Sequence, residues 1–190
     1  EVHDFMEKYA KEWNLDLEWC RNDDVIKAAG SKLNATVKVK DLNERNQAEL
    51  KRIGFEEETF PFEAESYTGN HLMKTVMFNM YIERHNVKGI FQGLRRDEQA
   101  ARVQDDYFEE KEAAHLIPPH LRIKPILHFT ERLLWNTYQV YKIPYCILYE
   151  QGYRSLGAKT TSAIAAPEVP AWEQDLEHTT ERAGRRQDKE

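Results

Sequence analysis

Gly89-Ile-Phe-Gln-Gly93 is a short apolar run that ends in glycine, and Leu94-Arg-Arg-Asp-Glu-Gln-Ala-Ala-Arg102 follows it as a charged turn. A short apolar run bounded by glycine is typical of a strand. Apolar residues recur at helical spacing on both sides of it, at 69–85 and at 130–141. This helix–strand–helix alternation predicts an α/β fold with a mainly parallel sheet.

The other segments extend the alternation. Apolar spacing predicts a helix over 2–13. A short helix is expected over 23–29, ended by Gly30, and a polar helix over 41–53, with Gly54 beyond its end. Leu15-Asp-Leu-Glu-Trp19 alternates as a half-buried strand would, and Arg122-Ile-Lys-Pro-Ile-Leu127 is a second strand candidate. Pro125 places this candidate at a sheet edge or a strand end, because proline cannot donate to a strand ladder.

Composition excludes several classes of function. The chain has 190 residues and a net charge of −6, whereas sequence-independent nucleic-acid binding relies on basic surface. No apolar run is long enough to span a membrane and no signal-peptide pattern opens the chain, so a cytoplasmic protein is expected. The two cysteines, Cys20 and Cys146, are too few and too far apart for a disulfide scaffold or a zinc site.

In α/β sheets, ligands bind beyond the carboxyl ends of the strands. The turn after Gly93 is one such place. Arg95 and Arg96 offer planar donors that match phosphate or sulfate oxygens. A helix beginning near Asp97 would add partial positive charge there and would put Arg95 and Arg102 on one side. A solvated helix start with Arg–Glu pairs explains the pattern equally well.

The second such place is the turn from Gly152 to Gly157. Two glycines allow close backbone approach, and Arg154 and Lys159 supply charge, so an anion cradle is one interpretation and a plain surface loop the other. The order of residues is not that of a P-loop. Lys74, near the start of the 69–85 helix, either snorkels along an apolar face or reaches a phosphate.

Five segments stand in a specific order: Gly69-Asn-His-Leu-Met-Lys-Thr75, Gly93-Leu-Arg-Arg-Asp-Glu-Gln-Ala-Ala-Arg102, Arg122-Ile-Lys-Pro-Ile-Leu-His-Phe-Thr-Glu-Arg-Leu-Leu-Trp135, Ile143-Pro-Tyr-Cys-Ile-Leu-Tyr149 and Gly152-Tyr-Arg-Ser-Leu-Gly157. Together they resemble the phosphoadenosine phosphosulfate reductase family, which belongs to the PP-loop ATP pyrophosphatases. The resemblance implies a Rossmann-like three-layer fold that binds an adenine nucleotide. It implies an enzyme.

Three branches of the family compete. The Arg-Arg-Asp-Glu block at 95–98 is similar to the catalytic subunit of ATP sulfurylase, which transfers AMP from ATP to sulfate and releases pyrophosphate. The run from Pro144 to Gly157, with Pro170-Ala-Trp and the later Glu181-Arg182, resembles FAD synthase, which transfers AMP to FMN. The reductases use a cysteine near the C-terminus, and no cysteine follows Cys146. We therefore expect adenylyl transfer to sulfate, with a reductase, an FMN adenylyltransferase and a non-catalytic nucleotide-binding module or fragment as alternatives.

The resemblance also implies site residues and partners. The expected catalytic residues are Arg95, Arg96 and Asp97, and the expected nucleotide- or phosphate-binding residues are Lys74, Gly93, Arg102, Gly152, Arg154, Gly157 and Lys159. Clustered cations would lower the repulsion between ATP and an anion, and Mg²⁺ is expected with ATP for the same reason. No cysteine pair precedes Lys74, so no iron–sulfur cluster is implied. The resemblance leaves open whether the protein forms a homodimer or binds a GTPase subunit as its partner.

One departure from the family concerns its phosphate loop, Ser-Gly-Gly-x-Asp-Ser, which does not occur in the chain. The loop lies upstream in family order, so we expect that the first β-loop-α unit is missing; a degenerate relative is the alternative.

The expected domains are 1–162, with a divergent insertion at 31–66, and a tail at 163–190. Within the insertion, Glu56 to Glu65 holds five glutamates and no lysine or arginine, which predicts a surface loop or a docking strip for a basic partner.

Overall fold

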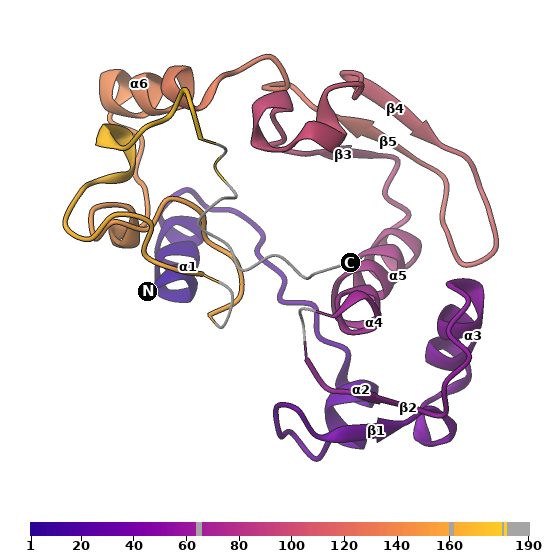
Figure 1. Ribbon diagram of the computed structural model, residues 1–190. Helices are drawn as coiled ribbons and strands as arrows, with labels where there is room; N and C mark the ends of the chain where they lie inside the picture. The colour runs from indigo at the N-terminus through magenta and orange to yellow at the C-terminus, as the bar shows by residue number, and fades with distance from the viewer. Residues whose placement is uncertain (64–65, 160–161, 180, 182–190) are drawn as a thin grey trace. The chain divides into compact units, whose positions relative to one another are not determined.

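The computed structural model describes residues 1–63, 66–159, 162–179 and 181. The chain divides into two units, which are described separately (Figure 1). Among the described residues, unit 1 comprises 1–18, 91–109, 122–159, 162–179 and 181, and unit 2 comprises 19–63, 66–90 and 110–121. A membrane-crossing helix is not found in any of the described segments.

Unit 2 begins with two helices whose starts are capped by asparagine. Its elements up to the second strand are α2 (Asp23–Ala28), β1 (Thr36–Lys38), the 3₁₀ turn η1 (Val39–Asp41), α3 (Glu44–Arg52) and β2 (Thr59–Pro61). The side chain of Asn22 accepts a hydrogen bond from the backbone N–H of Val25, and that of Asn43 accepts one from Asn46. Such caps satisfy backbone donors that lack partners in the first turn, so they define where each helix begins. The helices expected at 23–29 and 41–53 are confirmed, the second in shortened form.

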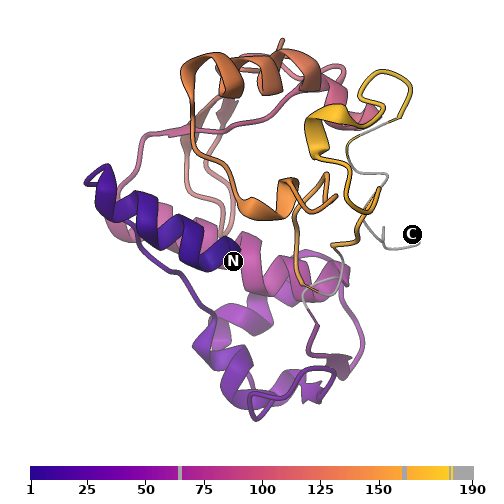
Figure 2. The same cartoon turned by 90° about the vertical axis from the view of Figure 1, so that its left-hand side faces the viewer.

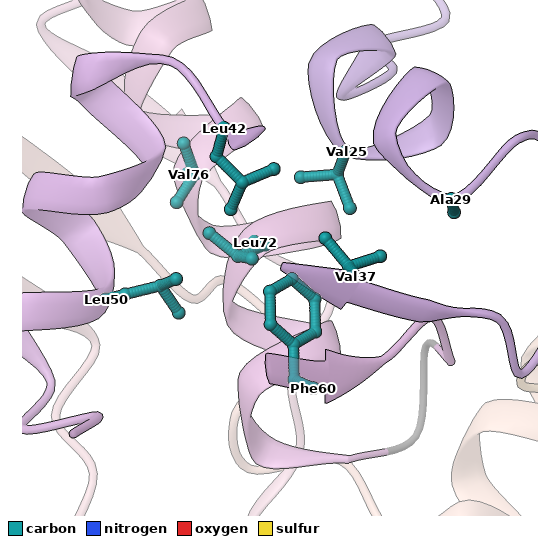
Figure 3. Packing of buried hydrophobic residues seen from close by; sticks show 8 residues of the cluster. All are labelled: Val25, Ala29, Val37, Leu42, Leu50, Phe60, Leu72 and Val76. Atoms are coloured by element: carbon teal, nitrogen blue, oxygen red, sulfur yellow. The ribbon is translucent and has the colours of Figure 1, made fainter. Parts of the chain in front are cut away.

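The sequence predicted a surface loop for the acidic stretch at 56–65, but part of this stretch forms a strand. It contains β2, which pairs antiparallel with β1 in the register Thr36↔Pro61, Val37↔Phe60 and Lys38↔Thr59. Val37 and Phe60 are buried opposite each other, which holds the two strands on the unit's apolar core. Figure 3 shows the eight core side chains: Val25, Ala29, Val37, Leu42, Leu50, Phe60, Leu72 and Val76. Residues 64–65 lie outside the described residues.

The helix predicted at 69–85 is present, but it contains an irregular turn. It consists of α4 (Tyr67–Asn70), the π-helical turn η2 (His71–Thr75) and α5 (Val76–His85). The backbone N–H of Val76 bonds to the carbonyl of His71, the wider spacing of a π-turn. The carbonyl of Leu72 accepts a hydrogen bond of 2.9 Å from the side chain of Asn22. The tertiary structure therefore supports a turn that a regular helix would not form.

A three-stranded sheet contains β3 (Gly89–Phe91), β4 (Phe108–Lys111) and β5 (His120–Ile123) in the order β3-β5-β4. The N–H of Leu121 bonds to the carbonyl of Lys88, and the N–H of Gln92 bonds to that of Ile123. Both partners advance along the chain together, which is the pattern of a parallel pair. The strand expected at 122–127 therefore exists as β5 and ends before Pro125. With helices alternating along the chain, this confirms an α/β fold.

The strand expected at Leu15–Trp19 is not formed. The segment follows α1 (Val2–Glu12), and two of its backbone bonds are local: Leu15 N–H to the carbonyl of Ala10, and Leu17 N–H to that of Leu15. The side chains of Leu15, Leu17 and Trp19 are exposed. Alternation alone does not make a strand where no neighbouring strand takes up its backbone donors.

The last part of unit 1 packs on α6 (Glu131–Tyr141) (Figures 1 and 2). Thr130 caps this helix as predicted, since its hydroxyl accepts the N–H of Leu133 at 3.1 Å. The chain then forms the 3₁₀ turns η5 (Ile147–Tyr149) and η6 (Ala171–Glu173). Buried Trp135 contacts the aromatic rings of Tyr145 and Trp172 at centroid distances of 5.9 and 5.4 Å. This aromatic cluster holds the segment after α6 against the helix.

Candidate functional site

Arg95 is the centre of the candidate site, and it is buried. Its Nε donates to Asp97 at 2.9 Å, and its Nη2 donates to Glu181 at 2.9 Å. Its Nη1 lies 3.7 Å from a carboxylate oxygen of Glu98. Three carboxylates thus surround one guanidinium that is 4% exposed. Burial of a charge is tolerated only with such pairing, so the position and orientation of Arg95 are fixed.

The carboxylate of Glu181 is held by two donors. Arg95 Nη2 donates to its Oε2 at 2.9 Å, and the hydroxyl of fully buried Ser155 donates to its Oε1 at 3.0 Å. A carboxylate and a sulfate or phosphate present similar oxygen acceptors to a guanidinium. Arg95 and Ser155 therefore form a two-donor cradle for an oxyanion, and Glu181 supplies that oxyanion from within the chain.

Asp97 joins this cradle to α6. One of its carboxylate oxygens accepts from Arg95, and the other accepts the backbone N–H of Glu131 at 2.6 Å. A negative charge at the first turn of a helix is stabilised by the helix dipole. The helix expected to begin near Asp97 is not formed: η3 (Arg96–Glu98) and η4 (Ala100–Arg102) are short 3₁₀ turns, interrupted by extended Gln99. Asp97 instead caps a helix that lies later in the chain.

Arg154 is fully engaged within the protein. Its Nε and Nη2 donate to the carboxylate of Glu131, with the Nη2 contact at 2.7 Å. Its Nη1 donates to the carbonyl of Asp175 and the hydroxyl of Thr179, and its Nη2 donates to the carbonyl of Thr179. A guanidinium has five N–H donors, and these contacts use all of them. The sequence predicted phosphate binding here; the structure shows Arg154 holding α6 and the segment at 175–179 together.

Arg96 and Arg102 contact different residues of unit 1. Arg96 donates to the carbonyl of Asp105 at 2.8 Å and lies 5.5 Å from the centre of the Tyr107 ring. Arg102 forms an ion pair with Glu98. Arg95 and Arg102 thus meet at Glu98, but through two short turns and not along one face of a helix, as the sequence predicted.

Lys124 is a buried cation that also contacts Asp105. It is 3% exposed, and its Nζ donates to Asp105 at 3.0 Å and to Glu109 at 3.1 Å. Burial lowers the pKa of Lys124, but the two carboxylates outweigh burial, so the pKa is raised above its ordinary value. The charged form is therefore the one that the folded protein stabilises.

The glycines of the candidate site differ in their structural constraint. Gly152 has a φ of +90°, and a Cβ there would lie 2.1 Å from the carbonyl oxygen of Ala166. At Gly93 the nearest atom to such a Cβ is 3.9 Å away. The N–H of Gly157 is accepted by the hydroxyl of Ser162 at 2.8 Å, so it is already in use. Gly152 is therefore required to be glycine, whereas Gly93 is not.

The two predicted lysines are exposed. Lys159 lies beside the Gly157 turn in unit 1, and Lys74 lies on η2 in unit 2. The contacts above join Arg95, Asp97 and Arg154 into one network, and Lys74 is not part of it. Arg182, which supported the resemblance to FAD synthase, lies outside the described residues.

Four members of the network were not predicted as site residues: Glu98, Glu131, Ser155 and Glu181. Glu131 follows the capping threonine, where an acidic residue is ordinary. Ser155 lies inside the predicted turn, next to Arg154, but a lone serine carries no signal. Their roles arise from contacts between segments far apart in sequence.

Mg²⁺ prefers oxygen ligands and is held by one or two carboxylates together with substrate phosphates. Both oxygens of Asp97 are occupied by donors, and Glu98 pairs with Arg95 and Arg102. No cluster of three metal-ligating side chains occurs in the part of the chain that the structure describes. These residues do not fit a metal site of the protein's own.

Comparison with known families gives a match over most of the chain. The model of the phosphoadenosine phosphosulfate reductase domain matches residues 1–164. The phosphoadenosine 5'-phosphosulfate reductase of Xanthomonas oryzae pv. oryzae is 32% identical over 88 residues, which are 46% of this chain and 34% of that protein. The same enzyme of Xylella fastidiosa is 29% identical over 100 residues, 53% of this chain and 40% of that protein. The matched part is thus well under half of each relative.

Solved structures show a related fold. Candida glabrata FMN adenylyltransferase in complex with FAD and inorganic pyrophosphate has a TM-score of 0.53 at 18% identity, covering 62% of this chain and 55% of that one. The same enzyme with FMN and the ATP analogue AMPCPP has a TM-score of 0.51 at 18% identity, covering 60% and 56%. At this identity the likeness concerns the fold, and it agrees with the predicted resemblance to FAD synthase.

Proposed function

Because the chain belongs to the phosphoadenosine phosphosulfate reductase domain family, we propose that the protein carrying it transfers AMP from ATP to an anionic acceptor, sulfate. The observation that supports this most is the cradle of Arg95 and Ser155 around the carboxylate of Glu181. In the proposed reaction the acceptor takes the place of that carboxylate. Glu181 then acts as an internal stand-in that keeps a buried guanidinium paired when no acceptor is bound.

The proposed step needs no redox group. A sulfate oxygen attacks the α-phosphorus of ATP, a new phosphorus–oxygen bond forms, and the bond to the β-phosphate oxygen breaks to release pyrophosphate. Both reactants are anions, so fixed cations lower the barrier by offsetting their repulsion and the charge of the leaving group. Magnesium enters with ATP as part of the substrate.

The residues have different proposed roles. Arg95 and Ser155 hold the acceptor, and Asp97 fixes the orientation of Arg95 through its 2.9 Å contact. Arg96, Arg102 and Lys159 are proposed to meet the phosphates of ATP. Arg154 is a positioning residue, since its donors are used on Glu131, Asp175 and Thr179.

A reductase is the second candidate, favoured by the names of the relatives at 29–32% identity. In that reaction a pair of thiols would give two electrons to the sulfonate sulfur of phosphoadenosine phosphosulfate. The bond between that sulfur and the phosphate oxygen would break, releasing sulfite, adenosine 3',5'-bisphosphate and two protons, and the thiols would become a disulfide. The same cradle would hold the sulfonate oxygens. Cys20 is exposed and Cys146 is buried.

The experiment supplies each acceptor separately to the complete polypeptide that carries this chain. We expect release of pyrophosphate from ATP that depends on sulfate. Pyrophosphate release that depends on FMN would show that the acceptor is FMN and not sulfate. Sulfite formed from phosphoadenosine phosphosulfate with a dithiol, without pyrophosphate release, would replace the proposal with the reductase.

A further inference from the structure

Unit 2 contains a cavity of about 790 Å³ that none of the predicted site residues lines. Organic ligands are bound in cavities of roughly 300–1,000 Å³. Its walls come from the end of β1, η1, α3 and the segment that leads into β2. The lining residues are Lys38, Val39, Lys40, Gln47, Ala48, Leu50, Lys51, Phe55, Glu56, Glu57, Glu58 and Thr59.

The fold fixes the walls of this cavity. The backbone N–H of Val39 donates to the carbonyl of Glu58 at 2.9 Å, which joins η1 to the opposite wall. Leu50 is 1% exposed and belongs to the core on which the cavity rests. Phe55 contacts Phe60 edge-on at 6.0 Å, so its ring is anchored to the same core. The cavity therefore has an apolar, rigid base.

The lysines around this base differ from the arginines of α3 in their pairing. In the described part of the chain, the side chains of Lys38, Lys40 and Lys51 have no carboxylate within ion-pair distance, although three glutamates line the same cavity. The arginines of the same helix behave differently. Arg45 and Arg52 both pair with buried Glu49.

We propose that this cavity binds a small organic anion: a phosphate or carboxylate attached to an aromatic or heteroaromatic ring. The ring packs on Phe55 and the apolar base, and the three ammonium groups converge on the anionic group. Glu56–Glu58 accept hydrogen bonds from hydroxyl or amino groups on the same ligand. The proposal rests on the cavity and its charged lining, and it does not depend on the adenylyl-transfer proposal.

The test uses phenyl phosphate as the probe, measured by titration calorimetry at low ionic strength. A double variant, Lys40→Gln with Lys51→Gln, removes two of the three cations. The control is Lys27→Gln, which removes one exposed cation from α2 outside the cavity. All three lysines are exposed, and thermal unfolding of each variant verifies that the fold is kept.

We expect the double variant to bind phenyl phosphate at least about tenfold more weakly than the unaltered chain, and Lys27→Gln to bind as the unaltered chain does. Phe55→Leu should weaken the binding of phenyl phosphate but leave the binding of inorganic phosphate unchanged. No binding by the unaltered chain, equal loss in the control, or tighter binding of benzylamine than of phenyl phosphate would overturn the proposal.

Discussion

The molecule has two clusters of cationic side chains, which differ in their burial and in whether they form ion pairs. In unit 1, Arg95 and Arg154 are 4% and 5% exposed, and carboxylates of the same chain hold both. In unit 2, Lys38, Lys40 and Lys51 are exposed around a cavity and form no described ion pair. An unpaired buried guanidinium group would destabilise the folded protein, so it needs ion-pair partners, whereas an exposed ammonium group remains hydrated. The first cluster, the buried framework of Arg95 and Arg154, stabilises the fold, and the second is the cationic lining of the proposed anion site.

The largest expected effect is on the framework. Arg154→Met leaves the carboxylate of Glu131 buried without its partner, so the free energy of unfolding should fall by about 3–5 kcal/mol. Urea denaturation measures it. The matched control is Arg132→Gln, whose pair with Glu177 at 2.6 Å is largely exposed. It should cost at most about 1 kcal/mol. Equal losses in the two variants would contradict the contrast between buried and exposed pairs.

A smaller effect is expected at Gly152. Alanine there must adopt a φ of +90° and place its Cβ against the carbonyl of Ala166. We expect a loss of about 1–3 kcal/mol in unfolding free energy. In Gly93→Ala the added Cβ makes only an ordinary van der Waals contact with Ile126, at 3.9 Å, and should leave stability within about 0.5 kcal/mol of the unaltered chain. If Gly152→Ala proves as stable as Gly93→Ala, the turn is not constrained as described.

The smallest effect concerns the paired charges of unit 2. His71 is 6% exposed, and its ring nitrogen lies 3.1 Å from Glu49. Burial lowers its pKa below the ordinary 6.5; Glu49 opposes this, and Arg52 adds to it. The unfolded chain therefore binds a proton before the folded one does, and stability should fall as the pH drops below 6.5.

Urea midpoints measured from about pH 7.5 down to about pH 5 detect this loss. His71→Gln should remove part of the slope, and His115→Gln, an exposed control, should keep it. A slope that is the same in both variants would show that His71 is not the group responsible.

Much of the fold was accessible from the sequence because its signals are local. The capping threonine at 130, the apolar spacing of α6 and the strand before Gly93 needed no knowledge of tertiary structure. The segment Leu15–Trp19 shows the limit, since a strand depends on a partner that its own residues do not specify. The π-turn at His71–Thr75 depends likewise on Asn22, about 50 positions away.

The candidate site was accessible only in part. Sequence reasoning selected Arg95, Asp97 and Arg154, and the structure joins them. It missed Ser155 and Glu131 because their roles come from pairing across the chain. Arg154 shows the converse: its residue type suggested phosphate binding, but five internal contacts give it a structural role.

The most direct test of the proposed site is the KM for sulfate in pyrophosphate release. Ser155→Ala removes one donor of the cradle without altering charge, and Glu181→Gln weakens the internal competitor for Arg95. We predict that Ser155→Ala raises the KM about tenfold and that Glu181→Gln lowers it. An unchanged KM in both variants would show that Arg95 and Ser155 do not hold the acceptor.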